Sequence, residues 1–200
     1  MGDTYATLAE LKARFGITDT NDDTALTNAL AAASRGIEKY CRRQFNDAGA
    51  ASSRVYNPTA SNLALVDDFH TTTGLIVETD TDDDGLFDTT WVNSEYQLEP
   101  LNGVRDGLSG WPYWKIRGVD TVRFPNLSRA SLRVTARWGW AAVPAPIKES
   151  CLALAEETFK LKDAPFGVAG MGEFGVVRIQ DNRRVVTMLA PYRRTATRVA

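Results

Sequence analysis

Aspartates crowd one short run of the sequence, and carboxylates at such spacing are the ligands that calcium prefers. Asp80, Asp82 and Asp84 alternate along the run DTDDDG, whose last residue is a glycine. This pattern reproduces the first half of a helix-flanked calcium loop. The position that should supply a bidentate glutamate is Trp91, and the flanking segments have the pattern of strands. We therefore predict an acidic β-hairpin turn, whose candidate residues for weak, non-standard calcium binding are Asp80, Asp82, Asp84 and Asp88.

A glycine motif, G-x-G-x-x-G at residues 170–175, is the second pattern with possible chemistry. In dinucleotide-binding proteins it follows a strand and opens a helix. Here it follows a predicted helix and precedes a β-branched run, so we interpret it as a hinge. A kinase is excluded as well, because the sequence contains neither His-Arg-Asp nor Asp-Phe-Gly.

Residues that could act as nucleophiles or zinc ligands are few and scattered. The cysteines, Cys41 and Cys151, lie far apart, and His70 is the single histidine. This composition excludes a zinc site, and no serine has the surroundings of a catalytic nucleophile. Both cysteines occupy apolar helical positions, so we expect them to be buried and reduced, with a disulfide between the helices as the alternative. We interpret His70 as a surface-loop residue, and we predict no cofactor and no enzymatic activity.

Trp138 and Trp140, in a WGW run near arginines, could stack on nucleobases. Aromatic residues at the end of a strand more often anchor a core or an interface, and we favour that interpretation. A nucleic-acid-binding module that uses the basic C-terminal half stays as the alternative function. The pI near 5.5 argues against it, because non-specific DNA binding needs a dominant positive surface.

Charge is distributed unequally along the chain. Residues 1–100 hold 17 acidic and 7 basic side chains, whereas residues 101–200 hold 8 acidic and 16 basic ones, although the total is −2. Opposite potentials steer partners, so this polarity fits a nucleic-acid face, pairing within the chain, or head-to-tail contact between copies. The negative excess gathers in the predicted β segment and the positive excess at the C-terminus. Docking of a basic arm on a different protein is therefore the sharper expectation.

Two helices are predicted before residue 46. The capping box of Thr7 and Glu10 opens the first, which ends near Gly16. The second is expected over 22–45, with an amphipathic stripe of Leu26, Leu30, Ala33, Ile37 and Tyr40. Its small residues let another backbone approach closely, either from the same chain or from a neighbouring subunit. The candidate subunit-interface residues are Ala29, Ala32 and Gly36.

Strand periodicity dominates from about 50 to 140. The candidate strands are 54–57, 63–67, 74–79, 86–92, 96–99, 114–119, 121–124 and 131–138. Prolines then close this segment, and a largely apolar third helix is predicted over 146–162, packed on the first two. We therefore predict an α+β fold with an extended C-terminal arm. Its three-helix core is formed by 1–46 and 143–162, and an antiparallel β module, barrel-like or sandwich-like, is inserted as 47–142.

The last segment, 163–200, is predicted to be a glycine-rich hinge followed by a basic docking arm. Residues 176–200 hold six arginines and one aspartate. Such a terminus becomes ordered when it is tied down on another surface. The candidate docking residues are Phe174, Arg178, Arg183, Arg184, Arg193, Arg194 and Arg198.

Membrane insertion is not expected. No apolar run approaches the roughly 20 residues of a spanning helix. The first residues also lack a basic start followed by an apolar block, so we expect synthesis in a reducing cytoplasm.

Several stretches resemble the head-tail connector proteins of tailed phages, which are also called adaptor or head completion proteins. Residues 5–19 and 31–45 carry the resemblance to the opening of that family. The run ARWGWAAVP at 136–144, the helix that follows it, and APFG at 164–167 resemble the actinobacteriophage branch. The likeness therefore spans most of the chain.

This resemblance implies a structural virion protein that forms a ring of roughly twelve copies beneath the capsid portal. The implied partners are the portal protein and a tail-side connector or tail terminator protein, with genomic DNA in the lumen bound without sequence specificity, and no membrane. The implied location is the head-tail neck of the virion, with the host cytoplasm during assembly. The β insertion is large for the family.

Overall fold

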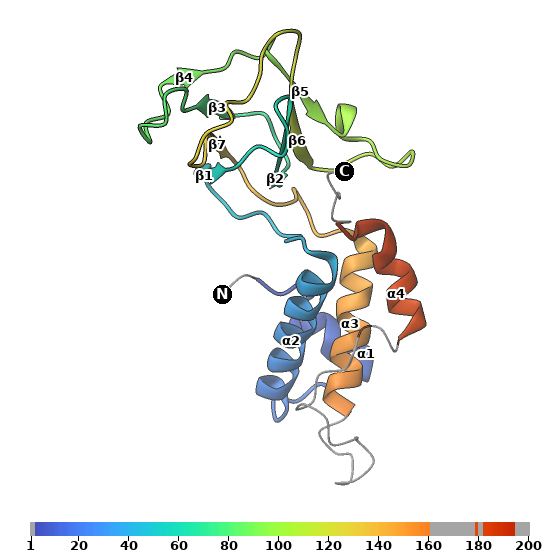
Figure 1. Cartoon of the computed structure of the whole chain (residues 1–200). Helices are drawn as coiled ribbons and strands as arrows, with labels where there is room; N and C mark the ends of the chain where they lie inside the picture. The colour runs from blue at the N-terminus through green and yellow to red at the C-terminus, as the bar shows by residue number, and fades with distance from the viewer. Residues whose placement is uncertain (1–2, 161–178, 180–181, 195–200) are drawn as a thin grey trace. The chain divides into compact units, whose positions relative to one another are not determined.

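The computed structural model describes residues 3–160, 179 and 182–194 of the chain (Figure 1). They divide into two compact units. The helical unit contains the residues up to Asn46 and those from Ala142 onward, and the β unit runs from Asp47 to Ala141. The predicted α+β class is confirmed, because the chain has four α-helices and two antiparallel sheets among the described residues.

Helix α1, Leu8–Phe15, begins with the predicted capping box. The backbone N–H of Glu10 donates to the Thr7 hydroxyl at 3.2 Å, and the Glu10 carboxylate accepts from the Thr7 N–H at 2.8 Å. The helix ends at Gly16, whose φ of 69° is left-handed. A glycine adopts that conformation without steric cost, which explains why the helix stops there.

Helix α2, Asp23–Cys41, is shorter than predicted at its C-terminal end. Arg42 adopts a left-handed φ of 54°, and its N–H donates to the Glu38 carbonyl, which closes the helix four residues before Asn46. The aliphatic stripe Leu26, Leu30 and Ile37 is fully buried. The amphipathic pattern therefore located the core-facing side correctly, whereas the end depends on one backbone conformation.

Helix α3, Ala145–Lys160, packs against α2 as predicted. At their contact the Ser34 hydroxyl lies 3.4 Å from the Cys151 sulfur, and both side chains are buried. Cys41 and Cys151 are free, which confirms the prediction of reduced, buried thiols. Burial raises the pKa of Cys41 to about 12, partly offset by Arg43 and Arg193.

Helix α4, Arg183–Leu189, lies in the stretch that we assigned to the docking arm. The Asn182 side chain accepts from the Val185 N–H at 3.0 Å and so caps the helix. Val185 and Leu189 are buried, since they lie four residues apart on one face, and α4 packs on α3. A short 3-10 helix, η4 (Ala190–Tyr192), follows. This part of the arm therefore belongs to the helical core. The glycine motif at 170–175, interpreted as a hinge, and the docking candidates Phe174, Arg178 and Arg198 lie outside the described residues.

The β unit contains two antiparallel sheets, with the strand orders β1-β7-β3-β4 and β2-β6-β5. The first sheet consists of β1 (Ser52–Tyr56), β7 (Leu132–Ala136), β3 (Ile76–Thr79) and β4 (Thr89–Thr90). The second consists of β2 (Leu63–Phe69), β6 (Tyr113–Gly118) and β5 (Tyr96–Glu99), after which comes the 3-10 turn η1 (Leu101–Gly103). Both sheets contribute side chains to one hydrophobic core. The arrangement is sandwich-like, because the sheets do not close into a barrel.

Two predicted strands differ from the structure. Residues 121–124 form no strand, because Asp120 has a left-handed φ of 50° and the Val122 N–H donates to the Val119 carbonyl in a tight turn. Phe124 is buried instead by stacking on Trp91, with ring centroids 4.5 Å apart. The predicted strand at 86–92 is reduced to β4, since the acidic turn occupies its first residues.

Among the helices that the structure describes, none has the length and apolar composition needed to cross a membrane.

Candidate assembly surfaces

The acidic turn, residues 80–88, is organised around one buried carboxylate. Asp80 is fully buried, and its two oxygens accept the backbone N–H groups of Asp82, Asp83 and Gly85 at 3.2, 2.9 and 2.9 Å. Burial by itself would raise the pKa of Asp80, but these donors outweigh it and lower the pKa. The turn therefore has a defined backbone that does not depend on a bound ion.

The predicted calcium ligands are only partly brought together. Carboxylate oxygens of Asp80, Asp82 and Asp84 lie within 4.8 Å of one another, whereas Asp88 is not part of that group. Asp82 and Asp84 are exposed, and repulsion from Asp84 raises the pKa of Asp82. The oxygens of Asp80 are already used by backbone donors. Calcium binding at this turn stays a prediction.

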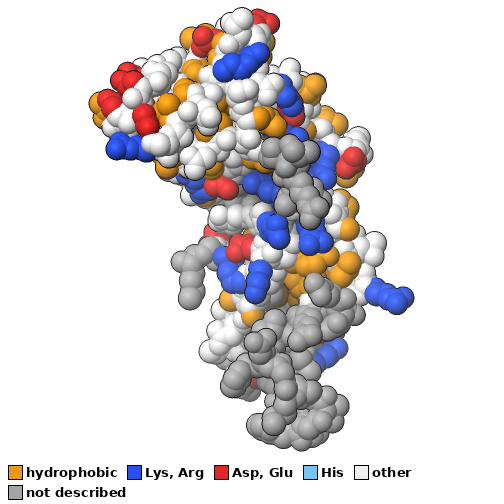
Figure 2. All heavy atoms as spheres, in the orientation of Figure 1, with side chains coloured by type: hydrophobic (Ala, Val, Ile, Leu, Met, Phe, Trp, Pro, Cys, Tyr) orange, Lys and Arg blue, Asp and Glu red, His pale blue; other side chains and the backbone are white. Residues whose placement is uncertain are grey.

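A neighbouring loop fastens the acidic turn from outside. The Ser128 hydroxyl donates to the Asp83 carboxylate at 2.5 Å, and the Arg129 guanidinium donates to the Asp84 carbonyl at 3.3 Å. Figure 2 shows acidic side chains gathered at this tip of the β unit. The turn therefore presents its remaining carboxylates on a rigid support.

All of the net charge of the β unit lies in this turn. Residues 47–141 contain 13 acidic and 8 basic side chains, and the turn alone contains five aspartates and no cation. Elsewhere in the unit acids and bases pair closely, as in Arg133 with Glu78 at 2.7 Å and Arg117 with Glu99 at 2.8 Å. The turn is therefore a local surplus of negative charge on a balanced unit.

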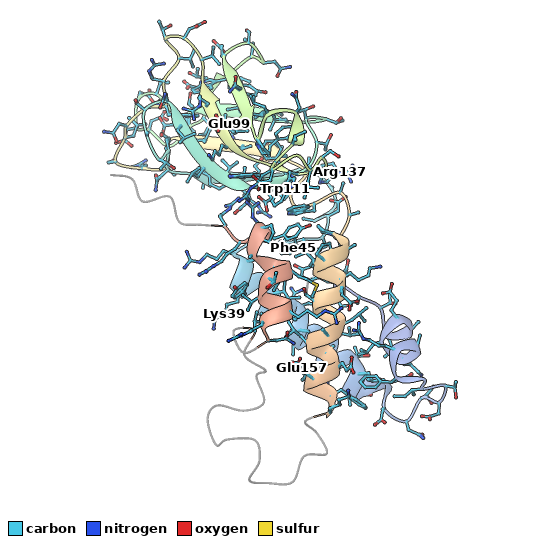
Figure 3. The ribbon with its side chains drawn as sticks, turned by 90° about the vertical axis from the view of Figure 1, so that its right-hand side faces the viewer. Lys39, Phe45, Glu99, Trp111, Arg137 and Glu157 are labelled. Atoms are coloured by element: carbon cyan, nitrogen blue, oxygen red, sulfur yellow. The ribbon has the colours of Figure 1, made fainter. Side chains whose placement is uncertain are left out.

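A basic surface lies at the C-terminal end of α2, and we call it the basic end. Lys39 and Arg42 are exposed there, and in Figure 3 the Lys39 side chain points outward from the helices. The Arg193 guanidinium lies 5.3 Å from the centre of the Tyr40 ring. The N–H of Arg194 donates to the Cys41 carbonyl at 2.9 Å, which ties η4 to this end of α2. The basic end consists of Lys39, Arg42, Arg43, Arg193 and Arg194, of which Arg43 is buried.

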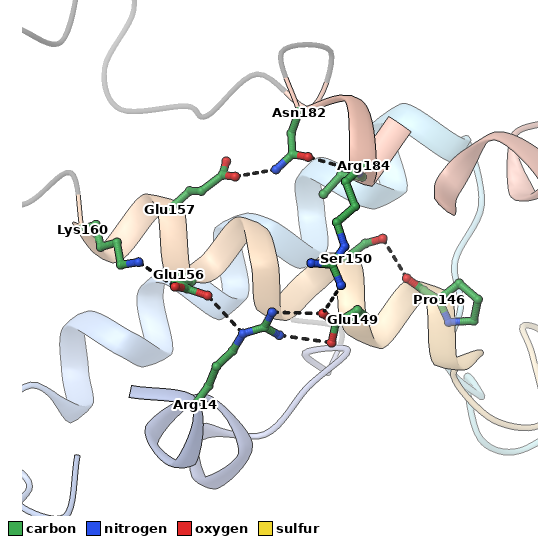
Figure 4. Close-up of polar contacts among 10 residues, drawn as sticks. Arg14, Pro146, Glu149, Ser150, Glu156, Glu157, Lys160, Asn182 and Arg184 are labelled. Atoms are coloured by element: carbon green, nitrogen blue, oxygen red, sulfur yellow. Dashed lines mark hydrogen bonds and ion pairs between the residues drawn. The ribbon is translucent and has the colours of Figure 1, made fainter. Parts of the chain in front are cut away.

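The docking arginines predicted from the sequence do not form one surface. Arg184 joins an ion-pair network in which Glu149 also binds Arg14 at 3.0 Å, and Arg14 in turn binds Glu156 (Figure 4). Arg183 is exposed on α4. Arg193 and Arg194 belong to the basic end, together with residues of α2 that we did not include among the docking candidates. The KYCRR run at 39–43 was the available signal for them.

The small residues of α2 are not equivalent in the folded unit. Ala29 is buried, and a Cβ added to Gly36 would lie 3.7 Å from the Ile179 side chain, so both face the same chain. Ala32 is exposed and remains accessible to another subunit.

Trp138, Trp140 and His70 are largely shielded from solvent in the β unit. Trp138 and Trp140 are 1% and 4% exposed, and their indole N–H groups donate to the Ser52 carbonyl and the Asp68 carboxylate. Packing is thus confirmed, because neither ring offers a free face to a base. The prediction of a surface His70 is wrong, since its side chain is 11% exposed and lies 3.8 Å from the Asp47 carboxylate.

A protein-family model matches part of this chain in sequence, and solved structures match it in fold. Residues 5–86, which include α1, α2 and β1 to β3, match the family model of phage gp6-like head-tail connector proteins. This segment is therefore similar to the connector family. The predicted resemblance to this family is confirmed for that segment. The more specific resemblance to the actinobacteriophage branch stays a prediction. No curated protein sequence matches the chain.

Solved structures resemble the fold of almost the whole chain. One is a chain from the neck of an empty GTA particle computed with C6 symmetry, with a TM-score of 0.59 and 18% identity over 98% of this chain and 93% of that chain. Another is a chain from the neck of a native GTA particle computed with C12 symmetry, with a TM-score of 0.54 and 14% identity over 100% and 98%. A chain from the virion of a native gene transfer agent has a TM-score of 0.51 and 18% identity over 98% and 93%. At such identities the likeness concerns the fold.

Proposed function

We propose that this connector protein is a structural subunit of the neck of a phage-like virion, where its copies form a ring that joins the head to the tail. The observation that carries the proposal is the connector-family match of residues 5–86 on a chain whose whole fold resembles neck proteins of GTA particles. The subunit acts by binding neighbours and carries out no reaction.

The proposed ring has about twelve copies. The similar neck structures computed with C6 and C12 symmetry support this number. A contact between two different surfaces, repeated by rotation, closes into such a ring. In the assembled neck, genomic DNA would pass through the lumen without sequence-specific contacts.

The proposed partners are the portal protein on the head side and a tail-side connector or tail terminator protein. Arginines near the C-terminus remain our candidates for portal docking, and among the described ones Arg183 is exposed and makes no ion pair with a described residue. Deletion of 176–200 is a poor test of docking, because it would also remove the buried Val185 and Leu189.

Joining of heads to tails tests the proposed function directly. Heads that carry the portal but lack this protein are mixed with tails, with and without the purified full-length chain, and joined particles are counted by electron microscopy. We expect joining only when the chain is present, together with density for it in the neck. Equal joining in its absence would overturn the proposal.

The alternative of a nucleic-acid-binding module loses the support of the two tryptophans, since Trp138 and Trp140 are buried and cannot stack on bases. A DNA mobility-shift experiment at low salt provides the check, and we expect no shift with the isolated chain at micromolar concentration.

A further inference from the structure

Two surfaces of the chain carry exposed charges that form no ion pair with a residue the structure describes. Among the described residues, Asp82 and Asp88 make no ion pair. Lys39, Arg42 and Arg193 likewise make none within the described part of the chain, although Arg193 stacks on Tyr40. The chain pairs most of its other charges closely, so these two surfaces stand apart.

The two surfaces match in charge and in stiffness. Three aspartates of the acidic turn are exposed, namely Asp82, Asp84 and Asp88. Three cations of the basic end are exposed as well, namely Lys39, Arg42 and Arg193. The Asp80 hydrogen bonds and the Ser128 contact hold the turn, while α2, the Tyr40 ring and the Arg194 backbone bond hold the basic end. Binding between preorganised surfaces loses little conformational entropy, and complementary potentials set register as well as rate.

We propose that the acidic turn of one copy binds the basic end of α2 in the adjacent copy of the ring. This inference rests on the proposed function, because it requires an assembly of copies. The contact joins two different surfaces, so each copy offers its acidic turn to one neighbour and its basic end to the other. Interfaces of this kind can close into a ring.

A second copy fits the basic end better than DNA does. Each chain that brings the cationic surface also brings one acidic turn, so the numbers of sites match in any homo-oligomer. Binding of DNA at the basic end would leave the turns unneutralised. A cation beside Asp82 would also relieve the repulsion that it receives from Asp84.

Zero-length cross-linking of assembled necks tests the contact. Heads are loaded with an equal mixture of chains in natural and in ¹⁵N-labelled form, and a carbodiimide couples carboxylates to amines in direct contact. Arg42→Lys and Arg193→Lys add amines without a change of charge. We expect cross-links between Lys39, or these new lysines, and the 80–88 peptide, with mixed labels in about half of them because copies pair at random. If every cross-linked pair carried the same label, the contact would lie within one chain, and the inference would be overturned. The absence of any cross-link to the 80–88 peptide would overturn it as well.

Charge reversal on opposite surfaces provides the second test. The acid variant is Asp82→Lys with Asp88→Lys, and the base variant is Lys39→Glu with Arg42→Glu. Each variant alone should reduce the joining of heads to tails about tenfold or more, whereas a mixture of the two should restore it, because alternating copies again meet opposite charge. If the mixture failed to restore joining, and only a chain that carries both sets of changes restored it, the two surfaces would meet within one chain. That result would overturn the contact between copies.

Matched controls separate this inference from the proposed function. Asp3→Lys with Asp19→Lys makes the same change of charge at exposed aspartates outside the turn, neither of which has a left-handed φ, and joining should stay within about threefold of the original protein. Full joining by both reversal variants would refute the contact and leave the connector function standing. No joining by the unchanged chain would refute the connector function itself. Loss of assembly with a calcium chelator, combined with indifference to Lys39→Glu, would assign the turn to calcium and overturn the inference.

Discussion

The helical unit and the β unit bury their interiors in different ways. The helical core is mainly aliphatic, with Leu26, Leu30 and Ile37 on one face of α2. The β core is built around aromatic rings, among them Trp91, Phe124 and Trp138. Aliphatic stripes depend on local periodicity, whereas an aromatic ring with a polar N–H depends on a partner far away in sequence. The β unit should therefore be more sensitive to single substitutions than the helical unit.

Trp138→Ala should have the largest effect on stability. The ring is 1% exposed, lies between Tyr56 and Phe69, and donates its indole N–H to the Ser52 carbonyl at 2.8 Å. Its removal should lower the free energy of unfolding of the β unit by about 3–5 kcal/mol. Chemical denaturation followed by the fluorescence of the other tryptophans measures this change. Trp138→Phe, which keeps most of the volume, should cost clearly less, and an equal cost would contradict the cavity argument.

Ile37→Ala should have the next largest effect and should act on the helical unit. Ile37 is fully buried in the α2 stripe, so the substitution should cost about 2–4 kcal/mol through lost burial and a residual cavity. Far-UV circular dichroism during denaturation reports the loss of helix. Ala32→Ser on the exposed side of α2 serves as the control and should change stability by less than about 0.5 kcal/mol. A loss for Ile37→Ala as large as that for Trp138→Ala would remove the contrast between the units.

These two substitutions also mark how far the sequence could predict the fold. The capping box at Thr7 and the α2 stripe were predictable, because each depends on residues within one or two helical turns. The burial of Phe124 on Trp91 was not, because a local pattern of four residues resembles a strand and cannot reveal a stacking partner elsewhere in the chain. Helix α4 was missed for a different reason. Its Asn182 cap and the spacing of Val185 and Leu189 were visible, but the arginine-rich composition favoured an arm.

The assembly surfaces were predictable to a similar, partial extent. The acidic turn was located correctly from its Asp and Gly content. The burial of Asp80 was not foreseen, because the sequence of the turn does not distinguish a buried aspartate from an exposed one. The basic end combines residues of α2 with Arg193 and Arg194, which follow about 150 positions later, and only the folded unit brings them together. Sequence therefore located the charges, and structure grouped them into surfaces.

Asp80→Ala tests whether the acidic turn depends on its buried carboxylate. The substitution leaves the N–H groups of Asp82, Asp83 and Gly85 without their acceptor and should cost about 1–3 kcal/mol. Asp80→Asn retains an acceptor oxygen and should cost less. Amide hydrogen exchange should accelerate at these three positions in Asp80→Ala. Unchanged exchange there would show that other contacts, such as the one from Ser128, suffice to hold the turn.

Glu10→Gln should have the smallest effect, and it tests the acid sensitivity of the helical unit. A hydrogen bond from Lys148 at 2.9 Å is the main cause that lowers the pKa of Glu10 from 4.5 to about 2, followed by bonds from Thr7. A lowered pKa in the folded state stabilises the fold above pH 4.5, and this contribution is lost as the pH falls toward 2. Because the Glu10 side chain is 37% exposed, solvent screening reduces the contribution to about 1 kcal/mol.

Denaturation curves at several pH values measure the Glu10 contribution. The difference between the original protein and Glu10→Gln should be about 1 kcal/mol at pH 7 and should shrink as the pH falls from 4.5, reaching zero below pH 2, where the folded-state Glu10 is protonated as well. Lys148→Met should remove most of the same pH dependence, because it deletes the main cause of the lowered pKa. A difference that stays constant between pH 7 and pH 2 would assign the effect to the geometry of the cap rather than to its charge, since the hydrogen-bonding shape of Gln does not titrate.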